Sequence, residues 1–219
     1  MSRILETPPP PIRDVLRARH ARHAPRSDDE QYAAFGNVET RNGLQELVEI
    51  PLLLRALALP MGGRVLEVGC GRGVALPVLT ERLAPEALVG IDVDAALIAV
   101  AADRIRRWRT RPAGHVTVHV ADVRDLPFES GSFDLVIDFG TCYHVGGGRV
   151  GARLALQEIS RVLRRDGLFV HETRVAQGLA HPVRSFGRTL PWGGVPELVV
   201  ERHAVLWSAR RKVGRRERR

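Results

Sequence analysis

Glycines at alternate positions and a later acidic residue are the first features of this sequence that could do chemistry. Gly69, Gly71 and Gly73 let the backbone turn sharply and leave room for a ligand to lie against its N–H groups. Asp92 stands nineteen residues after Gly73. At that spacing its carboxylate could accept hydrogen bonds from the two hydroxyls of a ribose. The combination predicts a site for a ligand that contains a ribose.

A dinucleotide-binding loop is the main alternative for this stretch. That loop has glycines at its first, third and sixth positions. Counted from Gly69, the sixth position is Val74, and the glycine stands at the fifth, Gly73. About 60 residues with helical patterning also precede the loop, whereas a nicotinamide domain more often starts near its first strand. The spacing therefore disfavours a nicotinamide cofactor.

Strand and helix patterns alternate around the glycine loop. Short apolar runs between turn residues predict strands, and apolar residues that recur every three or four positions predict helices. The predicted strands are 65–68, 87–93, 115–120, 133–139 and 168–172, and the predicted helices are 74–83, 95–108 and 150–164. Such alternation predicts an α/β fold in three layers, with a doubly wound, mostly parallel sheet.

The N-terminal part of the chain is patterned differently from this core. Residues 1–40 form a proline-rich, partly helical arm, which we expect to be partly disordered or to form a lid. Apolar residues between Arg41 and Leu59 share one helical face, interrupted by Pro51. They predict a bent helix or two short helices, and the residues of the shared face are Leu44, Leu47, Val48, Leu54 and Ala58.

The basic charge gathers at the C-terminus. The chain carries a formal net charge of +8, and residues 210–219, with six arginines, one lysine and one glutamate, account for +6 of it. Such a run is typical of a solvated tail, so nucleic acid is not the expected partner. Apolar residues within 198–211 predict an antiparallel edge of the sheet. We expect an arm at 1–40, one domain at 41–209 and a basic tail at 210–219.

The composition is that of an ordinary globular domain. With 219 residues, of which 44% are hydrophobic and 26% charged, the chain can bury one sizeable core. Cys70 and Cys142 are too few for a disulfide framework and are typical of a reducing compartment. No apolar run could span a membrane, and prolines stand where a signal peptide would be apolar. We therefore expect a cytoplasmic location and no membrane span.

Four stretches of the sequence carry a wider resemblance when they are taken in order. They are VLEVGCGRG at 65–73, VGIDV at 89–93, the segment from AD at 121–122 through LPF to SFDLV at 132–136, and EISRVLRRDGL at 158–168. Together they resemble the class I S-adenosylmethionine-dependent methyltransferases, especially small-molecule enzymes with a ubiquinone/menaquinone-biosynthesis-like core. The resemblance covers about half of the chain. It implies a Rossmann-like methyltransferase fold, S-adenosyl-L-methionine as cofactor and a transferase activity.

The resemblance assigns residues to the methionine and ribose ends of the cofactor. It implies that the loop residues Gly69, Cys70, Gly71 and Gly73 approach both groups. Glu67 would order the loop or reach the methionine ammonium through water. Asp92 would hold the ribose hydroxyls.

The resemblance also implies an adenine site and a site for the transferable methyl group. Val93 would pack on adenine, Asp122 would accept from its amino group, and the Val123 N–H would donate to a ring nitrogen. Asp138 and Phe139 would border the methyl group.

Simpler structural roles remain open for several of these residues. Glu67 could cap a neighbouring element, and Asp122 could be a turn residue. Asp94 is better placed as the N-cap of the next helix than as a ligand. Cys70 has the size of a small filler beside the glycines, and no partner pattern indicates a metal site.

The implied reaction is methyl transfer by in-line displacement, which depends mainly on alignment and on the exclusion of water. An oxygen or carbon acceptor must also lose a proton. His144, just after the fourth predicted strand, is the candidate base, although it could instead cap a helix. His171 and Glu172 are second choices, and Tyr143 and Tyr32 could line the acceptor pocket.

We therefore expect a methyltransferase that modifies a small organic acceptor. A methyltransferase of RNA or protein, or a non-catalytic S-adenosylmethionine-binding module, are the alternatives. The intact loop and Asp92 disfavour the latter. Amino-methylating DNA enzymes carry an Asp/Asn-Pro-Pro-aromatic signature where this chain has Asp138, Phe139, Gly140 and Thr141. Nucleic acid is thus not the expected substrate, and no pattern indicates the oligomeric state.

Overall fold

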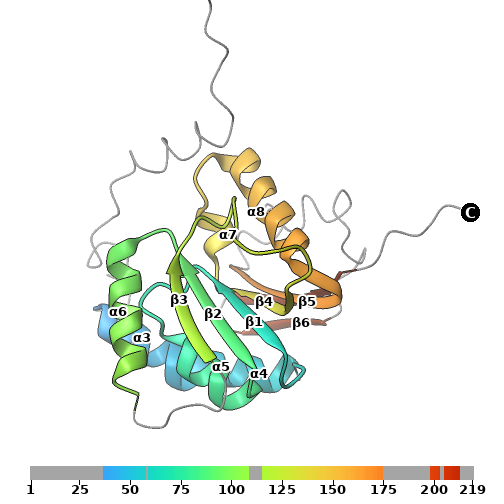
Figure 1. Ribbon diagram of the computed structural model, residues 1–219. Coiled ribbons are helices and arrows are strands. Elements are labelled where there is room, and N and C mark those ends of the chain that lie inside the picture. The colour runs from blue at the N-terminus through green and yellow to red at the C-terminus, as the bar shows by residue number, and fades with distance from the viewer. Residues whose placement is uncertain (1–36, 58, 109–114, 175–197, 203–204, 213–219) are drawn as a thin grey trace, which may run out of the picture.

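The computed structural model describes residues 37–57, 59–108, 115–174, 198–202 and 205–212 (Figure 1). The predicted N-terminal lid and Tyr32 lie outside these residues. Within them, no helix combines the length and the hydrophobicity needed to cross a membrane.

A seven-stranded sheet with the order β3-β2-β1-β4-β5-β7-β6 forms the centre of the molecule. Its first five members pair in parallel, which confirms the five predicted parallel strands. β7 runs antiparallel to both β5 and β6. The strands are β1 Arg64–Val68, β2 Ala87–Asp92, β3 His115–Val120, β4 Phe133–Asp138, β5 Leu163–Arg174, β6 Leu198–Arg202 and β7 Val205–Arg211.

Helices cover both faces of the sheet, as the apolar strands require. One face packs on α4 and α5, with α6 on the same face beside β2 and β3, and the other face packs on α8. Alternate residues of each strand supply the two cores, so Val65 belongs to one and Leu66 to the other. The helices are α4 Ile50–Leu57, α5 Ala75–Leu83, α6 Ala95–Arg106, α7 Thr141–His144 and α8 Gly148–Val162.

The N-terminal helix passes Pro51 without a break. α3 (Val38–Leu44) continues into a π-helical turn, η2 (Gln45–Glu49), and then into α4. Proline has no N–H to donate, and the wider turn with its bond from Ile50 N–H to the Gln45 carbonyl accommodates it. The extra residue per turn shifts the buried face. Leu44, Leu47 and Val48 of the predicted apolar face are 38%, 76% and 39% exposed, and Ile50 is buried instead.

β5 begins five residues earlier than the pattern predicted. Leu163 pairs with Phe133, and the register then shifts so that Leu168 pairs with Leu135. Asp166 adopts a positive φ of 63° in the irregular stretch of β5 between these two pairs. The predicted helix 150–164 accordingly ends at Val162.

The first basic residues of the C-terminus belong to the sheet. Arg210 and Arg211 pair with β5 as part of β7. Lys212 continues the pairing, since its N–H donates to the Gly167 carbonyl at 2.9 Å and its carbonyl accepts from Asp166 at 3.0 Å. The ordered sheet therefore extends through Lys212.

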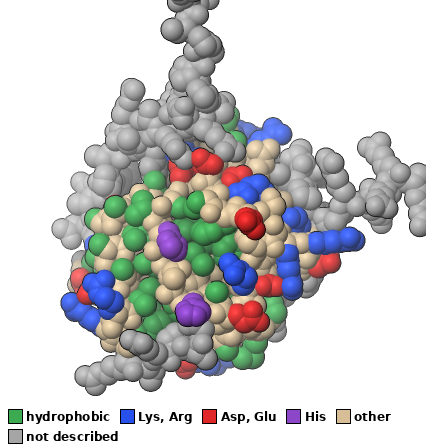
Figure 2. Space-filling view, in the orientation of Figure 1, with side chains coloured by type: hydrophobic (Ala, Val, Ile, Leu, Met, Phe, Trp, Pro, Cys, Tyr) green, Lys and Arg blue, Asp and Glu red, His purple; other side chains and the backbone are tan. Residues whose placement is uncertain are grey.

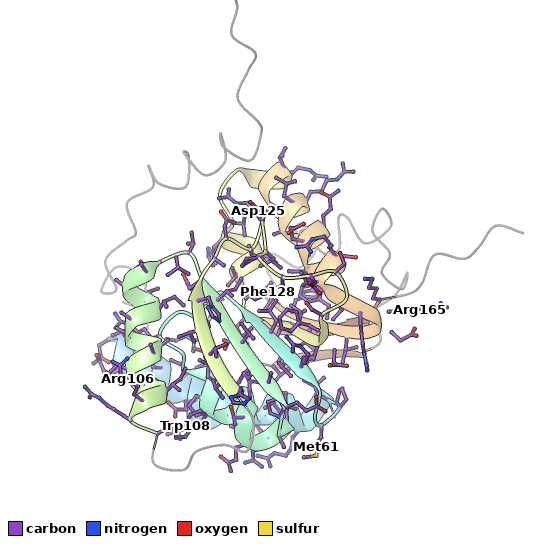
Figure 3. The ribbon with its side chains drawn as sticks, in the orientation of Figure 1. Met61, Arg106, Trp108, Asp125, Phe128 and Arg165 are labelled. Carbon is purple, nitrogen blue, oxygen red and sulfur yellow. The ribbon has the colours of Figure 1, made fainter. Side chains whose placement is uncertain are left out.

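The strand order reverses between β1 and β4. From β1 the chain winds outward through β2 to β3 and then crosses back to β4 on the other side of β1. Open α/β sheets bind ligands beyond the carboxyl ends of the strands at such a reversal. Figure 3 places Asp125, after β3, at this end of the molecule, and Met61, before β1, at the opposite end. The glycine loop after β1 and α7 after β4 meet at this edge.

Candidate cofactor and active site

The loop after β1 is a tight turn that requires its glycines. Gly69, Gly71 and Gly73 have φ values of 69°, 51° and 72°, in the region that other residues avoid. The Cys70 N–H donates to the Ile91 carbonyl at 2.8 Å, and the Gly73 N–H donates to the Cys70 carbonyl at 2.8 Å. These bonds hold the loop against the end of β2.

Two of the three glycines allow close packing of helices, and the third faces open space. A Cβ on Gly69 would overlap the Thr141 side chain, and a Cβ on Gly73 would lie 3.0 Å from the Ala101 Cβ. A Cβ on Gly71 would meet nothing within 4 Å. Gly69 and Gly73 thus let α7 and α6 pack closely on the loop. Gly71 turns toward open space, where a ligand could approach the backbone.

Cys70 is buried, which suits the role of a small filler, and its predicted contact with the cofactor stays a prediction. Its Sγ lies 2.9 Å from where a Cβ on Gly90 would stand, so the thiol packs directly on β2. Burial, with further contributions from the nearby charges of Glu67 and Asp92, raises the pKa of this thiol. In the described part of the chain, no group of three or more His, Cys, Asp or Glu side chains is arranged to hold a metal ion.

Asp92 turns its carboxylate toward the glycine loop. Its Oδ2 accepts from the Gly71 N–H at 3.0 Å, and its Oδ1 accepts from the Asp94 N–H at 2.9 Å. This places the carboxylate beside the open side of Gly71. Asp94 is confirmed as the N-cap of α6, since it accepts from Ala96 at 2.8 Å and from Leu97 at 3.4 Å.

Glu67 lies beneath the loop with its side chain only 3% exposed. Its Oε2 has no hydrogen-bond partner among the described residues. Burial and, to a lesser extent, the charge of Asp92 raise the pKa of Glu67 to about 8. The carboxyl group is therefore protonated at neutral pH, and it would ionise if a cation came near.

The predicted adenine site contains an exposed apolar wall and a buried ion pair. Val93, just after β2, and Val120, at the end of β3, are 44% and 55% exposed. Hydrophobic side chains gather on the face of the molecule that Figure 2 shows. Val123 is buried. Asp122 is held by Arg124, whose Nη2 lies 2.5 Å from Asp122 Oδ2. Arg124 was not predicted, because nothing in its sequence position marks it as a partner of Asp122.

Asp138 is a buried carboxylate that holds the start of α7. Its side chain is fully buried and accepts from the Thr141 N–H at 2.5 Å and the Cys142 N–H at 3.3 Å, which fixes the start of α7. Burial raises its pKa to about 6, although these hydrogen bonds act in the opposite direction. The predicted contact of Asp138 with the cofactor stays a prediction, which this buried carboxylate does not support.

Thr141 connects α7 to the first strand. Its Oγ1 donates to the Val68 carbonyl at 3.1 Å, and its side chain packs on Gly69. Cys142 is buried one residue later, and burial raises the pKa of its thiol. Methyl transfer needs no thiolate nucleophile, and this environment disfavours one.

The two candidate histidines lie in different surroundings. His144 ends α7 and is exposed at the carboxyl edge of the sheet. His171 is fully buried in β5, with its ring stacked 5.3 Å from that of Phe169. The side chains of Tyr143 and Glu172 lie outside the part that the structure describes. His144 is therefore the better placed of the two histidines to meet an acceptor.

Comparisons with known proteins agree with this arrangement. A family model described as a methyltransferase domain matches residues 66–171. The ubiquinone/menaquinone biosynthesis C-methyltransferase UbiE of Citrifermentans bemidjiense is 35% identical over 120 residues, which cover 53% of this chain and 48% of that protein. The chain thus spans about half the length of the curated relatives it matches.

Solved structures share the fold. A methyltransferase from Aquifex aeolicus, described as SAM-dependent, has a TM-score of 0.64 at 16% identity, over 86% of this chain and all of that one. The geranyl diphosphate C-methyltransferase of Streptomyces coelicolor A3(2) has a TM-score of 0.59 at 18% identity, over 89% of this chain and 88% of that one, and was solved with S-adenosyl-L-homocysteine. Residues 66–171, just under half of the chain, are thus similar to methyltransferase domains, and the fold is one that solved methyltransferases share.

Proposed function

We propose that this chain transfers a methyl group from S-adenosyl-L-methionine to a small organic acceptor. The observation that carries the proposal is the Asp92 carboxylate, bonded to the Gly71 N–H at 3.0 Å beside backbone that faces open space. A ribose laid on this backbone would meet the carboxylate with its hydroxyls. The matched relatives are named as C-methyltransferases of small molecules, which supports the same acceptor class.

The described residues fit the three parts of such a cofactor. Asp92 would bind the ribose, and the apolar surface of Val93 would pack on adenine with Asp122 at its amino group. The buried, unpartnered Oε2 of Glu67 suits a positively charged methionine ammonium, directly or through water. A bound cofactor supplies a sulfonium with an already reactive methyl group. The chain therefore needs to orient the acceptor, exclude water and remove a proton.

His144 is the proposed base. An imidazole nitrogen of this exposed side chain would take the acceptor proton as the methyl group is transferred. α7 carries His144, and Asp138 and Thr141 hold the start of α7 against β1 and Gly69. This anchoring of α7 supports the proposal, in which the base would act beside the loop that would hold the donor.

Two other functions compete with this proposal. The basic C-terminal residues favour an RNA or protein acceptor, and a module that binds the cofactor without catalysis is the second alternative. The proposal includes a small-molecule partner, a cytoplasmic location and an N-terminal arm that completes the acceptor site.

The first test is calorimetry and thermal melting with S-adenosyl-L-methionine and S-adenosyl-L-homocysteine. We expect both to bind and to raise the melting temperature, because a ligand that binds only the folded state stabilises it. The absence of both heat and stabilisation would refute the assignment. Incubation with isotopically labelled donor and separate small-molecule, RNA and protein fractions of the host would then identify the acceptor class. Label in none of the fractions would favour the non-catalytic module.

A further inference from the structure

Arg124 is a buried arginine in the loop between β3 and β4, with its side chain only 4% exposed. Its guanidinium grips the Asp122 carboxylate. Nε lies 2.9 Å from Oδ1 and 3.1 Å from Oδ2, and Nη2 lies 2.5 Å from Oδ2. The Arg124 N–H also donates to Oδ1 at 2.9 Å. A planar, two-pronged contact of this kind fixes the orientation of a carboxylate as well as its charge.

The other end of the same guanidinium reaches the turn between α7 and α8. Nη1 of Arg124 donates to the Gly146 carbonyl at 3.2 Å. On its other side this carbonyl packs so closely against α8 that a Cβ on Gly151 would overlap its oxygen. Contacts with α8 on one hand and with Arg124 on the other thus fix the position of the turn after His144.

We propose that Arg124 is a positioning residue that couples recognition of the adenine base to placement of the α7–α8 turn. The inference rests on the proposed function, in which Asp122 accepts from the adenine amino group. An adenine ring that binds Asp122 also orders the Arg124 guanidinium, and the guanidinium orders the Gly146 carbonyl. Coupling between two sites is reciprocal, so the conformation of the α7–α8 turn also affects the affinity for adenine.

The wild-type protein tests this coupling without any substitution. S-inosyl-L-homocysteine has an oxygen where S-adenosyl-L-homocysteine has the amino group, so it lacks the donor for Asp122. We expect the adenosyl compound to bind at least about ten-fold more tightly. At saturation of each compound, hydrogen exchange of the amides at 145–151 should slow more with the adenosyl compound. Equal protection of this segment by both compounds would overturn the proposal.

Substitution of the arginine tests which side chain carries the coupling. Arg124→Met should bring the affinity ratio of the two compounds close to one, and Arg124→Lys should lower it in part, because lysine keeps the charge but loses the fork. Arg161→Met is the matched control. Arg161 also pairs with a carboxylate, Glu158, and donates to the Leu126 and Phe128 carbonyls.

The control separates a positioning role from a merely structural one. Arg161→Met should lower the melting temperature but leave the affinity ratio at the wild-type value. An Arg124→Met or Arg124→Lys protein that keeps the wild-type ratio would refute the inference. If the wild-type protein binds neither compound, the proposed function itself fails. If it binds both with equal affinity, the function survives and the inference does not.

Discussion

Glu67 and Asp92 show how two carboxylates close together acquire different chemistry. Both face the same side of the sheet, because Glu67 is paired with Gly90 and Asp92 follows Gly90 by two residues. Glu67 is buried without a partner for Oε2, so its pKa rises to about 8. Asp92 instead accepts two backbone N–H groups at a partly exposed position. Environment therefore makes Glu67 a neutral acid and leaves Asp92 as the carboxylate that we propose to accept from a ribose.

The Asp92→Ala substitution should weaken the binding of S-adenosyl-L-homocysteine by at least about ten-fold. Hydrogen bonds to a charged group contribute about 1.5 to 3 kcal/mol each, and 1.4 kcal/mol corresponds to a factor of ten. Calorimetry measures the loss. Asp94→Ala is the control, because loss of this helix cap should cost about 1 kcal/mol of stability and leave the affinity unchanged. Equal affinities for the Asp92→Ala and wild-type proteins would contradict the ribose assignment.

Binding of the cofactor product at pH 7 should release about one proton from Glu67. The group is protonated in the free protein because its pKa is about 8, and a nearby ammonium would lower that pKa and drive ionisation. Calorimetry in buffers of different ionisation enthalpy measures the released proton. Glu67→Gln should abolish the release. A binding heat that is independent of the buffer in the wild-type protein would count against this role.

The same group predicts how stability depends on pH. Between about pH 4.5 and pH 8 the unfolded chain has lost the Glu67 proton while the native protein keeps it. The native state therefore binds more protons, and the contribution of Glu67 to the free energy of unfolding declines as the pH rises through this window. Denaturant titrations of the free protein should show a shallower decline for Glu67→Gln. Parallel curves for the two proteins would show that Glu67 does not titrate in this way.

His144→Gln should slow methyl transfer by about 10²-fold or more once an acceptor is known, because general-base catalysis contributes on that scale. The affinity for the cofactor should stay unchanged, since no contact of His144 with the glycine loop is needed to hold the donor. Single-turnover kinetics measures the chemical step. An unchanged rate would remove the base assignment without affecting the fold or the cofactor site.

At the scale of the elements, the strands were predictable and their ends were not. β1, β2, β4 and residues 167–171 of β5 are largely buried, which produces the apolar runs from which these strands were predicted, whereas the edge strand β3 is exposed or half-buried throughout. The early start of β5 depends on a register shift opposite Phe133, and the buried face of the N-terminal helix depends on the π-helical turn before Pro51. The register shift leaves no periodic signal, because it results from pairing with a distant strand, and the π-helical turn interrupts the period of about 3.6 residues on which the helix prediction rests.

For the candidate site, too, the sequence predicted the location but not the contacts between side chains. The glycines and Asp92 are spaced along the chain in a way that reflects the strand–loop–strand geometry directly. The roles of Asp138 and Arg124 depend on contacts with Thr141 and Gly146, which only the folded chain brings near. Residue type and spacing located the edge of the sheet where the site lies. They did not show which side chains face a ligand and which support others.

Substitutions in the glycine loop should separate stability from binding. Gly71→Ala should cost about 1 to 2 kcal/mol of stability, the penalty for a positive φ, because its Cβ meets no neighbour. It should also weaken S-adenosyl-L-homocysteine binding, because the Cβ projects toward the proposed ligand. Gly69→Ala should destabilise the protein further, since it adds a clash with Thr141 to the same penalty. Melting curves and calorimetry test both, and a greater stability loss at Gly71 would contradict this packing.

At the scale of the whole molecule, some of the basic C-terminal residues are also part of the sheet. Arg210, Arg211 and Lys212 belong to the paired edge of the sheet, and the Lys212 ammonium also donates to the Leu163 carbonyl. A deletion from residue 210 would therefore remove part of the sheet together with the basic charge. Any loss of turnover would then have two explanations. Residues 213–219, with four arginines and one glutamate, can be removed without cutting these bonds.

Truncation after Lys212 therefore tests the acceptor class. With a small acceptor, the truncated protein should keep its melting temperature, its affinity for S-adenosyl-L-homocysteine and its turnover, because the bonds that hold the sheet edge remain. Full-length protein with its last four arginines changed to glutamine is the matched control for charge alone. If both variants keep the cofactor affinity but lose turnover on the native acceptor, the arginines contact that acceptor. Salt dependence of the same loss would then favour RNA or an acidic protein, since phosphate and carboxylate contacts weaken as salt rises.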